Sequence, residues 1–205
     1  MTQDRAEALQ KIHEEIRACT KCPLHAGRTN AVPGVGPVDA EVMFIGEGPG
    51  FHEDQQGLPF VGASGQFLDE LLANAGIDRE SVYITNVVKC RPPGNRDPKP
   101  EEVEACKPYL DRQIELINPK VIVTLGRHSM ARAFPNDKIS RVHGQPRQVG
   151  EQIYFPMYHP AAALHQPSLR KTVEADFDRL RMMLDGEIEP ESYTPPPDVE
   201  QLSMF

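Results

Sequence analysis

Long apolar runs, internal repeats and a surplus of basic residues are all missing from this chain of 205 residues. No run approaches the roughly 18 apolar residues of a membrane-spanning helix, and no repeat of about 20 to 50 residues indicates a solenoid. The first residues, MTQDRAEALQK, alternate charged and apolar positions and do not resemble a secretory signal, so we expect a cytoplasmic protein. Apolar residues still make up 39% of the chain, which excludes a wholly disordered protein.

The deficit of basic residues is concentrated at one end of the chain. There are 22 Lys and Arg against 30 Asp and Glu, and a net charge of -8 argues at face value against a polyanionic ligand. Residues 185–205 hold six of these acids and no base, so the rest of the chain carries only -2. We predict one folded domain over residues 1–184 and a flexible, acidic, Pro-rich tail over residues 185–205.

Cysteine is scarce, and the chain has only Cys19, Cys22, Cys90 and Cys106. In a cytosolic protein a Cys-x-x-Cys pair with two further cysteines indicates metal or redox chemistry rather than disulfides. Cys106 alone could be a small buried apolar residue, but four thiols with no remainder favour a site with four ligands. Zinc and an iron–sulfur cluster both accept four thiolates, and the spacing does not distinguish them.

Short apolar segments and helical patterns alternate along the domain. Strands are expected over residues 42–47, 82–89, 121–126 and 153–159. Helices are expected over residues 4–17, 66–75, 101–117 and 169–184. This alternation predicts an α/β fold with a mostly parallel sheet covered on both faces. Ligands of such sheets bind at the carboxyl ends of the strands.

Several features at these strand ends have both a structural and a functional interpretation. The first strand runs into GEGPG, whose glycines either form a tight turn or let the backbone approach a ligand. Phe60 either plugs the core or stacks on a planar ring. Asn86 either pins a loop or reads a base edge. His159 is either a structural hydrogen-bonding residue or an electrophile that faces the same crevice.

Taken together, these residues resemble the family 4 uracil-DNA glycosylases, the iron–sulfur-containing branch of the uracil-DNA glycosylase superfamily. The resemblance rests on GEGPG at 46–50, LPFVG at 58–62, TNVVKCRPP at 85–93, MYHPA at 157–161 and the cysteine spacing. It implies a three-layer α/β/α fold around a four-stranded parallel sheet, and a 4Fe-4S cluster on Cys19, Cys22, Cys90 and Cys106. It also implies base excision repair, in which uracil is flipped out of single- or double-stranded DNA and its N-glycosidic bond is hydrolysed.

The resemblance further implies roles for individual residues. Glu47, Gly48 and Pro49 would line the uracil pocket, Phe60 would stack on the base, Asn86 would read its edge and His159 would contact uracil O2. Because the best-known branch of the superfamily has an acid at the position of Gly48, the carboxylate that positions water is open. Glu47 is the first candidate and Glu53 the second. Asn86 would reject cytosine, which reverses both of the hydrogen bonds that uracil offers.

Two basic segments follow neighbouring strands and could form one phosphate-binding rim. Residues 86–99 carry a local charge of +3, and residues 127–147 carry +4. By analogy with the family, the segment around His143 would enter the DNA as the base leaves it. The predicted DNA-binding residues are Lys89, Arg91, Arg96, Arg141, His143 and Gln145.

The last five residues, QLSMF, resemble the short peptide by which bacterial proteins dock on the sliding clamp of the replisome. Met204 and Phe205 would fill an apolar pocket while Gln201 makes a polar contact, with Leu202 in the same peptide. The alternative is a frayed terminus. We further expect a monomer associated with the nucleoid.

Two other functions fit parts of the same pattern. One is a nucleic-acid-binding protein that uses the cluster as a redox sensor and has no glycosylase activity. The other is a glycosylase of broader base preference. Glu47, Asn86 and His159 together favour an enzyme over the non-enzymatic protein.

Overall fold

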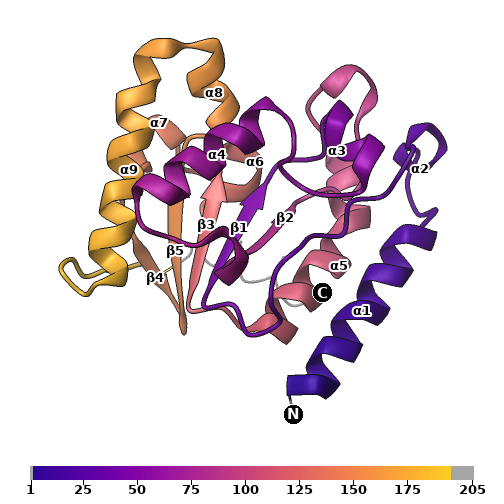
Figure 1. Ribbon diagram of the computed structural model, residues 1–205, viewed down its shortest axis with the longest axis horizontal. Coiled ribbons are helices and arrows are strands. Elements are labelled where there is room, and N and C mark those ends of the chain that lie inside the picture. Colours follow the sequence, from indigo (N-terminus) through magenta and orange to yellow (C-terminus); the bar gives the residue numbers. More distant parts are fainter. Residues whose placement is uncertain (1, 195–205) are drawn as a thin grey trace.

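A computed structural model describes residues 2–194 as a mixed α/β structure built on one six-stranded sheet (Figure 1). The strands are β1 (Val42–Gly46), β2 (Tyr83–Asn86), β3 (Val121–Leu125), β4 (Arg147–Val149), β5 (Gln152–Met157) and β6 (Glu191–Ser192). Their order is β2-β1-β3-β5-β4-β6, and the first four of these run parallel. Such parallel strands are buried on both faces, as the apolar runs predict.

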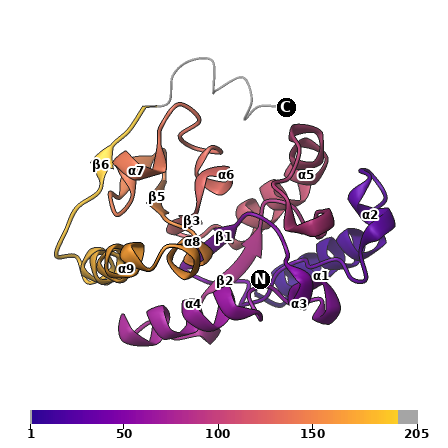
Figure 2. The same cartoon turned by 90° about the horizontal axis from the view of Figure 1, so that it is seen from above.

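Helices cover both faces of the sheet (Figure 2). They are α1 (Thr2–Ala18), α2 (Leu24–Gly27), α3 (Phe51–Gln56), α4 (Ala63–Asn74), α5 (Pro100–Ile117), α6 (Arg127–Met130), α7 (Ile139–Val142), α8 (Pro160–His165) and α9 (Arg170–Leu184). Successive residues of a strand point to opposite faces. Met43 and Ile45 of β1 therefore pack with α1 and α5, whereas Val42 and Phe44 pack with α4 and α9.

The predicted fold class is confirmed, and all four expected strands are present with shifted ends. The strand expected over 82–89 already ends at Asn86, because residues 87–90 bend out of the sheet. The sheet has six strands rather than four. Gly150, at a φ of 60°, allows a tight turn that returns the chain from β4 to β5 as an antiparallel pair.

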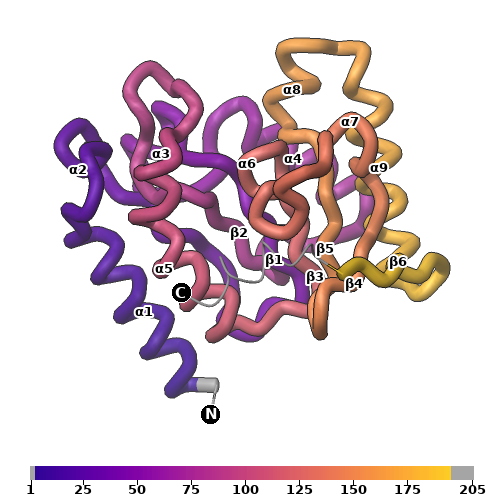
Figure 3. The backbone as a smooth tube through the Cα atoms, turned by 180° about the vertical axis from the view of Figure 1, so that it is seen from behind, coloured from indigo at the N-terminus to yellow at the C-terminus, as the bar shows by residue number. Residues whose placement is uncertain are grey.

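Part of the segment after α9 is paired to the sheet (Figure 3). Glu191 and Ser192 form β6 beside β4, and the Tyr193 N–H donates to the Gln148 carbonyl over 2.9 Å. The Tyr193 ring meets the Phe134 ring edge-on, with 4.8 Å between centroids. The predicted domain end at residue 184 coincides with the end of α9, but an anchored stretch of the expected tail follows it.

The carboxyl ends of the parallel strands bring the predicted site residues to one edge of the sheet. Gly46 at the end of β1 lies directly opposite Asn86 at the end of β2. Glu47 follows β1, Gly126 follows β3, and His159 lies two residues beyond β5. Within residues 2–194, no helix has the length and apolarity to cross a membrane.

Candidate active site and four-cysteine site

Asn86 presents a buried amide at the end of β2. Its side chain is only 2% exposed, yet its Oδ1 atom receives no hydrogen bond from any residue between 2 and 194. Leaving a buried acceptor unpaired costs about 1–3 kcal/mol, so such an atom indicates a missing donor. Gly46 leaves the space that this amide and the Phe60 ring occupy, because a Cβ there would collide with Asn86 Oδ1 and lie 2.7 Å from the Phe60 ring.

Phe60 is held in an unfavourable backbone conformation beside that space. Its φ of 53° is rare for a residue with a bulky side chain, and its side chain is almost fully buried. Arg79 donates to the carbonyls of Pro59 and Phe60, each over 3.1 Å. A Cβ at Gly65 in α4 would overlap the Phe60 carbonyl, so this glycine lets the helix press on the strained loop. Several contacts therefore fix Phe60 in place.

Glu53 ties the same loop to α3. Its Oε1 accepts the N–H groups of Val61 and Gly62 over 2.9 and 2.8 Å, and its Oε2 accepts the Gly50 N–H over 3.1 Å. Because three backbone N–H groups donate to this carboxylate, it holds the Gly-rich segments 46–50 and 58–62 together. This geometry favours a positioning role for Glu53 over its predicted role at water.

The His159 ring stacks against the Phe60 ring, with 5.5 Å between the ring centroids and 25° between their planes. Burial lowers the pKa of His159 to about 4, although Glu53 acts in the opposite direction. The Ala161 N–H donates to Nδ1 over 3.1 Å, at the start of α8. A neutral imidazole whose Nδ1 accepts must carry its proton on Nε2. His159 is thus a neutral donor at neutral pH.

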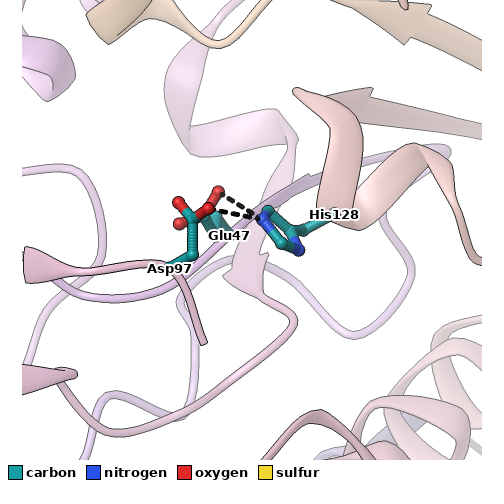
Figure 4. Close-up of side chains that lie close together, drawn as sticks. All are labelled: Glu47, Asp97 and His128. Carbon is teal, nitrogen blue, oxygen red and sulfur yellow. Dashed lines mark ion pairs between the residues drawn. The ribbon is translucent and has the colours of Figure 1, made fainter. Parts of the chain in front are cut away.

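Glu47 shares a cluster with Asp97, from the loop before α5, and with His128, from α6 (Figure 4). His128 Nε2 lies 3.6 Å from Glu47 Oε2 and also 3.6 Å from Asp97 Oδ2. Burial raises the pKa of Glu47; His128 and Arg127 lower it, whereas Asp97 raises it. Arg127 pairs with Asp97 on the outer side. A half-buried carboxylate with a raised pKa has the properties of a general base.

Gly48 leaves no room for the acid that the best-known branch carries there. A Cβ at Gly48 would lie 2.8 Å from Val88 Cγ2, a stiff side chain in the segment that follows β2. The carboxylate adjacent to this glycine in sequence is that of Glu47, one residue earlier. Pro49 follows in the turn that leads to α3.

The four cysteines come together from three parts of the chain. Cys19 and Cys22 lie just beyond α1, Cys90 lies just beyond β2, and Cys106 lies in α5. All four are free thiols and line one cavity. Burial raises the pKa of Cys106 to about 11, so a bare thiol there is not a nucleophile. Arg28 donates to Cys90 Sγ over 3.2 Å. Convergent thiols with a cationic donor suit a tetrathiolate metal centre.

Lys89 does not contact DNA, and this prediction is wrong. Its side chain is 1% exposed, and Nζ donates to Thr85 Oγ1, the Asn86 carbonyl and Gln113 Oε1 over 2.6, 2.8 and 2.7 Å. Burial lowers the pKa of Lys89 to about 7, whereas Cys106 acts to raise it. The strand-like pattern around Lys89 hid the bend that turns it inward.

The other predicted DNA-binding residues differ in how free they are. Arg96 makes two hydrogen bonds to the Glu102 carboxylate, 2.8 and 2.6 Å long, which hold its loop against the start of α5. Arg91 donates to Asn95 and lies over the Phe51 ring. Arg141 in α7 is exposed, and no acid in the described chain pairs with it. Of the three arginines, Arg141 is thus the most available to a phosphate.

The segment around His143 is fastened to α9. His143 Nδ1 lies 3.0 Å from both carboxylate oxygens of the buried Asp176, and the Gly144 carbonyl accepts from Arg179 over 2.8 Å. Gly144 has a φ of 68°, and a side chain there would meet the Asp176 carboxylate. The adjacent Gln145 is exposed. These contacts fasten the segment to α9, and the exposed Gln145 donates from Nε2 to the Arg141 carbonyl over 3.0 Å.

Sequence reasoning missed Asp97 and His128 as members of the site. Both lie in segments that follow strand ends, which is the signal that identified Glu47 and Asn86. In the sequence, Asp97 and Arg127 belong to the basic segments 86–99 and 127–147. The ion pair between Asp97 and Arg127 joins two distant segments and has no sequence signature. The clamp-like residues Gln201, Leu202, Met204 and Phe205 lie outside the described residues.

The chain belongs to the uracil DNA glycosylase superfamily, whose family profile matches residues 33–181. This match confirms the resemblance predicted from the motifs. It also places Glu47, Phe60, Asn86 and His159 within the segment shared with the family.

Relatives with a narrower name are similar over most of the chain. A protein of Sulfurisphaera tokodaii named type-4 uracil-DNA glycosylase is 50% identical over 198 residues, which are 92% of this chain and 89% of that protein. One of Archaeoglobus fulgidus with the same name is 51% identical over 85% of this chain and 92% of its own length. A third, from Thermotoga maritima, is 45% identical over 89% of this chain and 98% of its own.

Proposed function

We propose that this protein is a DNA repair glycosylase that excises uracil from DNA and leaves an abasic site. The observation that carries the proposal is the buried Asn86 Oδ1 atom, which has no donor within the described chain. Uracil supplies that donor with its N3–H group, while its O4 accepts from the Asn86 Nδ2 group. Cytosine offers the reverse pattern and leaves both groups unpaired, which discriminates by about 10⁴ in sites built for hydrogen bonds.

Excision begins with extrusion of the nucleotide from the base stack into the pocket. The fixed ring of Phe60 stacks on the base. As the bond between C1′ and N1 breaks, its electron pair moves onto the departing uracil, and the neutral His159 donates its Nε2–H to uracil O2. His159 keeps its proton, so it stabilises the anion without becoming charged.

Glu47 acts on the sugar side of the reaction. Its carboxylate stabilises the oxocarbenium character at C1′ and accepts a proton from the water that attacks there. His128 lies beside this carboxylate at the rim, and Asp97 lies beside the same imidazole nitrogen. Glu53 positions the two Gly-rich segments and does not touch the water.

A panel of oligonucleotides tests this function directly. The protein should release base from uracil-containing single- and double-stranded DNA, and not from matched strands with cytosine or thymine at the same position. Hypoxanthine and xanthine in the panel test for a broader base preference. Binding without base release from every oligonucleotide would instead support the non-enzymatic nucleic-acid-binding protein.

We further propose that Cys19, Cys22, Cys90 and Cys106 hold a 4Fe-4S cluster. The shared cavity, the four free thiols and the cationic Arg28 beside Cys90 support this assignment. When bound, such a cluster joins the end of α1 to β2 and α5. Protein purified anaerobically should be brown and contain iron and acid-labile sulfide in equal amounts. A colourless protein that contains zinc would contradict the cluster.

DNA contacts and a clamp contact complete the proposal. The exposed Arg141 and Gln145 would contact the duplex at this rim, so affinity should fall with salt concentration. The peptide QLSMF docks on a sliding clamp, which is supported by its resemblance to clamp-binding peptides alone. Deletion of residues 201–205 should abolish capture on immobilised clamp and leave uracil release unchanged. Unchanged capture would contradict the clamp contact.

A further inference from the structure

Lys89 is a fully buried lysine between the two sites, and its hydrogen bonds specify a charged ammonium. Thr85 Oγ1 gives its own hydrogen to the Pro33 carbonyl over 2.8 Å, so it can only accept from Lys89. Gln113 Nε2 donates to Pro33 and to Tyr83, so Gln113 Oε1 is the atom that faces Lys89. With the Asn86 carbonyl, Nζ therefore has three acceptors. An ammonium has three hydrogens to donate, whereas a neutral amine has two.

The buried charge has no carboxylate to compensate it. No acid in residues 2–194 forms a salt bridge with Lys89, and all three hydrogen-bond partners are neutral. A buried charge without a counter-ion is strongly destabilising. Lys89 does, however, line the same cavity as the four cysteines. Thiolates at that cavity supply the negative charge that the ammonium lacks.

The same ammonium also touches the residue that reads the base. Lys89 lies between Asn86 and Cys90 in the chain, and Nζ holds the Asn86 carbonyl over 2.8 Å. Its partner Gln113 lies in α5, the helix that carries Cys106. The segment 86–90 thus connects the pocket at one end with a cysteine ligand at the other. The position of the Lys89 ammonium and that of the Asn86 backbone are therefore linked through this hydrogen bond.

We propose that Lys89 is the counter-charge of the four-cysteine site and the positioning residue that couples this site to the uracil pocket. The inference rests on the proposed function, because it assumes a cluster at the cysteines and base recognition by Asn86. Nearby charge helps to set the reduction potential of an iron–sulfur cluster. A buried cation favours the cluster's more reduced, more negative state, so its removal lowers the potential.

Lys89→Met tests both parts, because methionine keeps most of the apolar stem and removes the ammonium. The midpoint potential of the cluster, measured by spectroelectrochemistry, should become more negative than in wild type. The kcat/KM for uracil release should fall roughly tenfold or more, as expected for loss of a charged hydrogen bond. Lys107→Met is the matched control, since Lys107 adjoins Cys106 in sequence but pairs with Asp111 near the surface. It should change neither quantity.

Gln113→Glu separates the charge from the positioning and serves if Lys89→Met does not retain its cluster. A carboxylate at position 113 neutralises the ammonium while Lys89 still donates to the Asn86 carbonyl. The potential should again become more negative, with a smaller loss of kcat/KM than in Lys89→Met. If both the Lys89 and the Gln113 variant have the wild-type potential, the inference about Lys89 is wrong. The proposed function is not affected by that result, because the wild-type protein would still contain the cluster and release uracil. A wild-type protein without an iron–sulfur cluster overturns the proposed cofactor as well.

Discussion

The uracil pocket and the four-cysteine site are built in opposite ways. The pocket lies at the ends of parallel strands, and struts such as Glu53 and Arg79 hold its residues in place through hydrogen bonds within the chain. The cysteine cavity gathers its thiols from three separate segments that no disulfide joins. A preformed pocket needs its ligand only for chemistry. A site of convergent thiols gains its cohesion from the group that it binds.

This difference predicts that variants of the pocket lose activity but not stability, and that variants of the cysteine site lose both. Substitutions at each site, together with measurements of unfolding and of uracil release, can therefore test the comparison.

The largest effect is expected at Asn86. Asn86→Asp replaces the amide donor by a carboxylate oxygen that repels uracil O4, so uracil release should fall by about 10⁴. Single-turnover assays on a uracil-containing oligonucleotide measure the rate, and chemical denaturation should give the wild-type free energy of unfolding. A wild-type rate would show that Asn86 does not read the base.

His159→Ala should lower uracil release by about 10² to 10³, because one donor to the developing anion is lost. In wild type the pKa of about 4 keeps His159 neutral, so its titration should produce no break in the single-turnover rate between about pH 6 and 8. A break near about pH 6.5 that disappears in His159→Ala would contradict a neutral donor.

Cys106→Ser tests the other side of the comparison. Loss of one ligand in α5 should release the bound group and lower the free energy of unfolding by more than about 3 kcal/mol. Metal analysis and denaturation of the purified variant measure the two changes. A variant that loses its metal but unfolds like wild type would show that the cysteine site is as self-supporting as the pocket.

A smaller effect concerns acid stability. Burial lowers the pKa of His13 and of His159 from 6.5 to about 4, so between these values the unfolded chain binds more protons than the folded one. Stability is therefore full above about pH 6.5 and declines as the pH falls toward about 4. From about pH 7 to pH 5 the buried His159 should contribute a loss of about 2 kcal/mol, and the more exposed His13 a smaller one. His13→Gln, which can retain the hydrogen bond to Tyr83, should remove the part of this loss that His13 contributes.

The smallest effect is expected at the DNA rim. Arg141→Ala should weaken DNA binding severalfold and reduce the slope of log affinity against log salt by about 1. Arg96→Ala should change that slope less, because Glu102 already pairs with Arg96. Fluorescence anisotropy at several salt concentrations measures both variants, and equal slopes would show that the ion pair does not shield Arg96.

The sequence predicted the parallel strands and the long helices because these elements follow simple apolar periodicities. It also predicted that Glu47, Asn86 and His159 lie at one edge of the sheet, because the carboxyl ends of parallel strands meet there. The prediction that Lys89 contacts DNA was wrong for a different reason. Residues 87–90 keep a strand-like composition after β2 ends, and only tertiary contacts turn the lysine inward. The short β6 was missed because an acidic stretch with few apolar residues pairs through its backbone alone.

The pairing of β6 also determines where the described chain ends relative to the proposed site. Strand order puts β6 at one edge of the sheet and β2, with Asn86, at the opposite edge. Tyr193 fixes the point at which the chain leaves the described fold. The described chain therefore ends at the β6 edge, with the width of the sheet between Thr194 and Asn86.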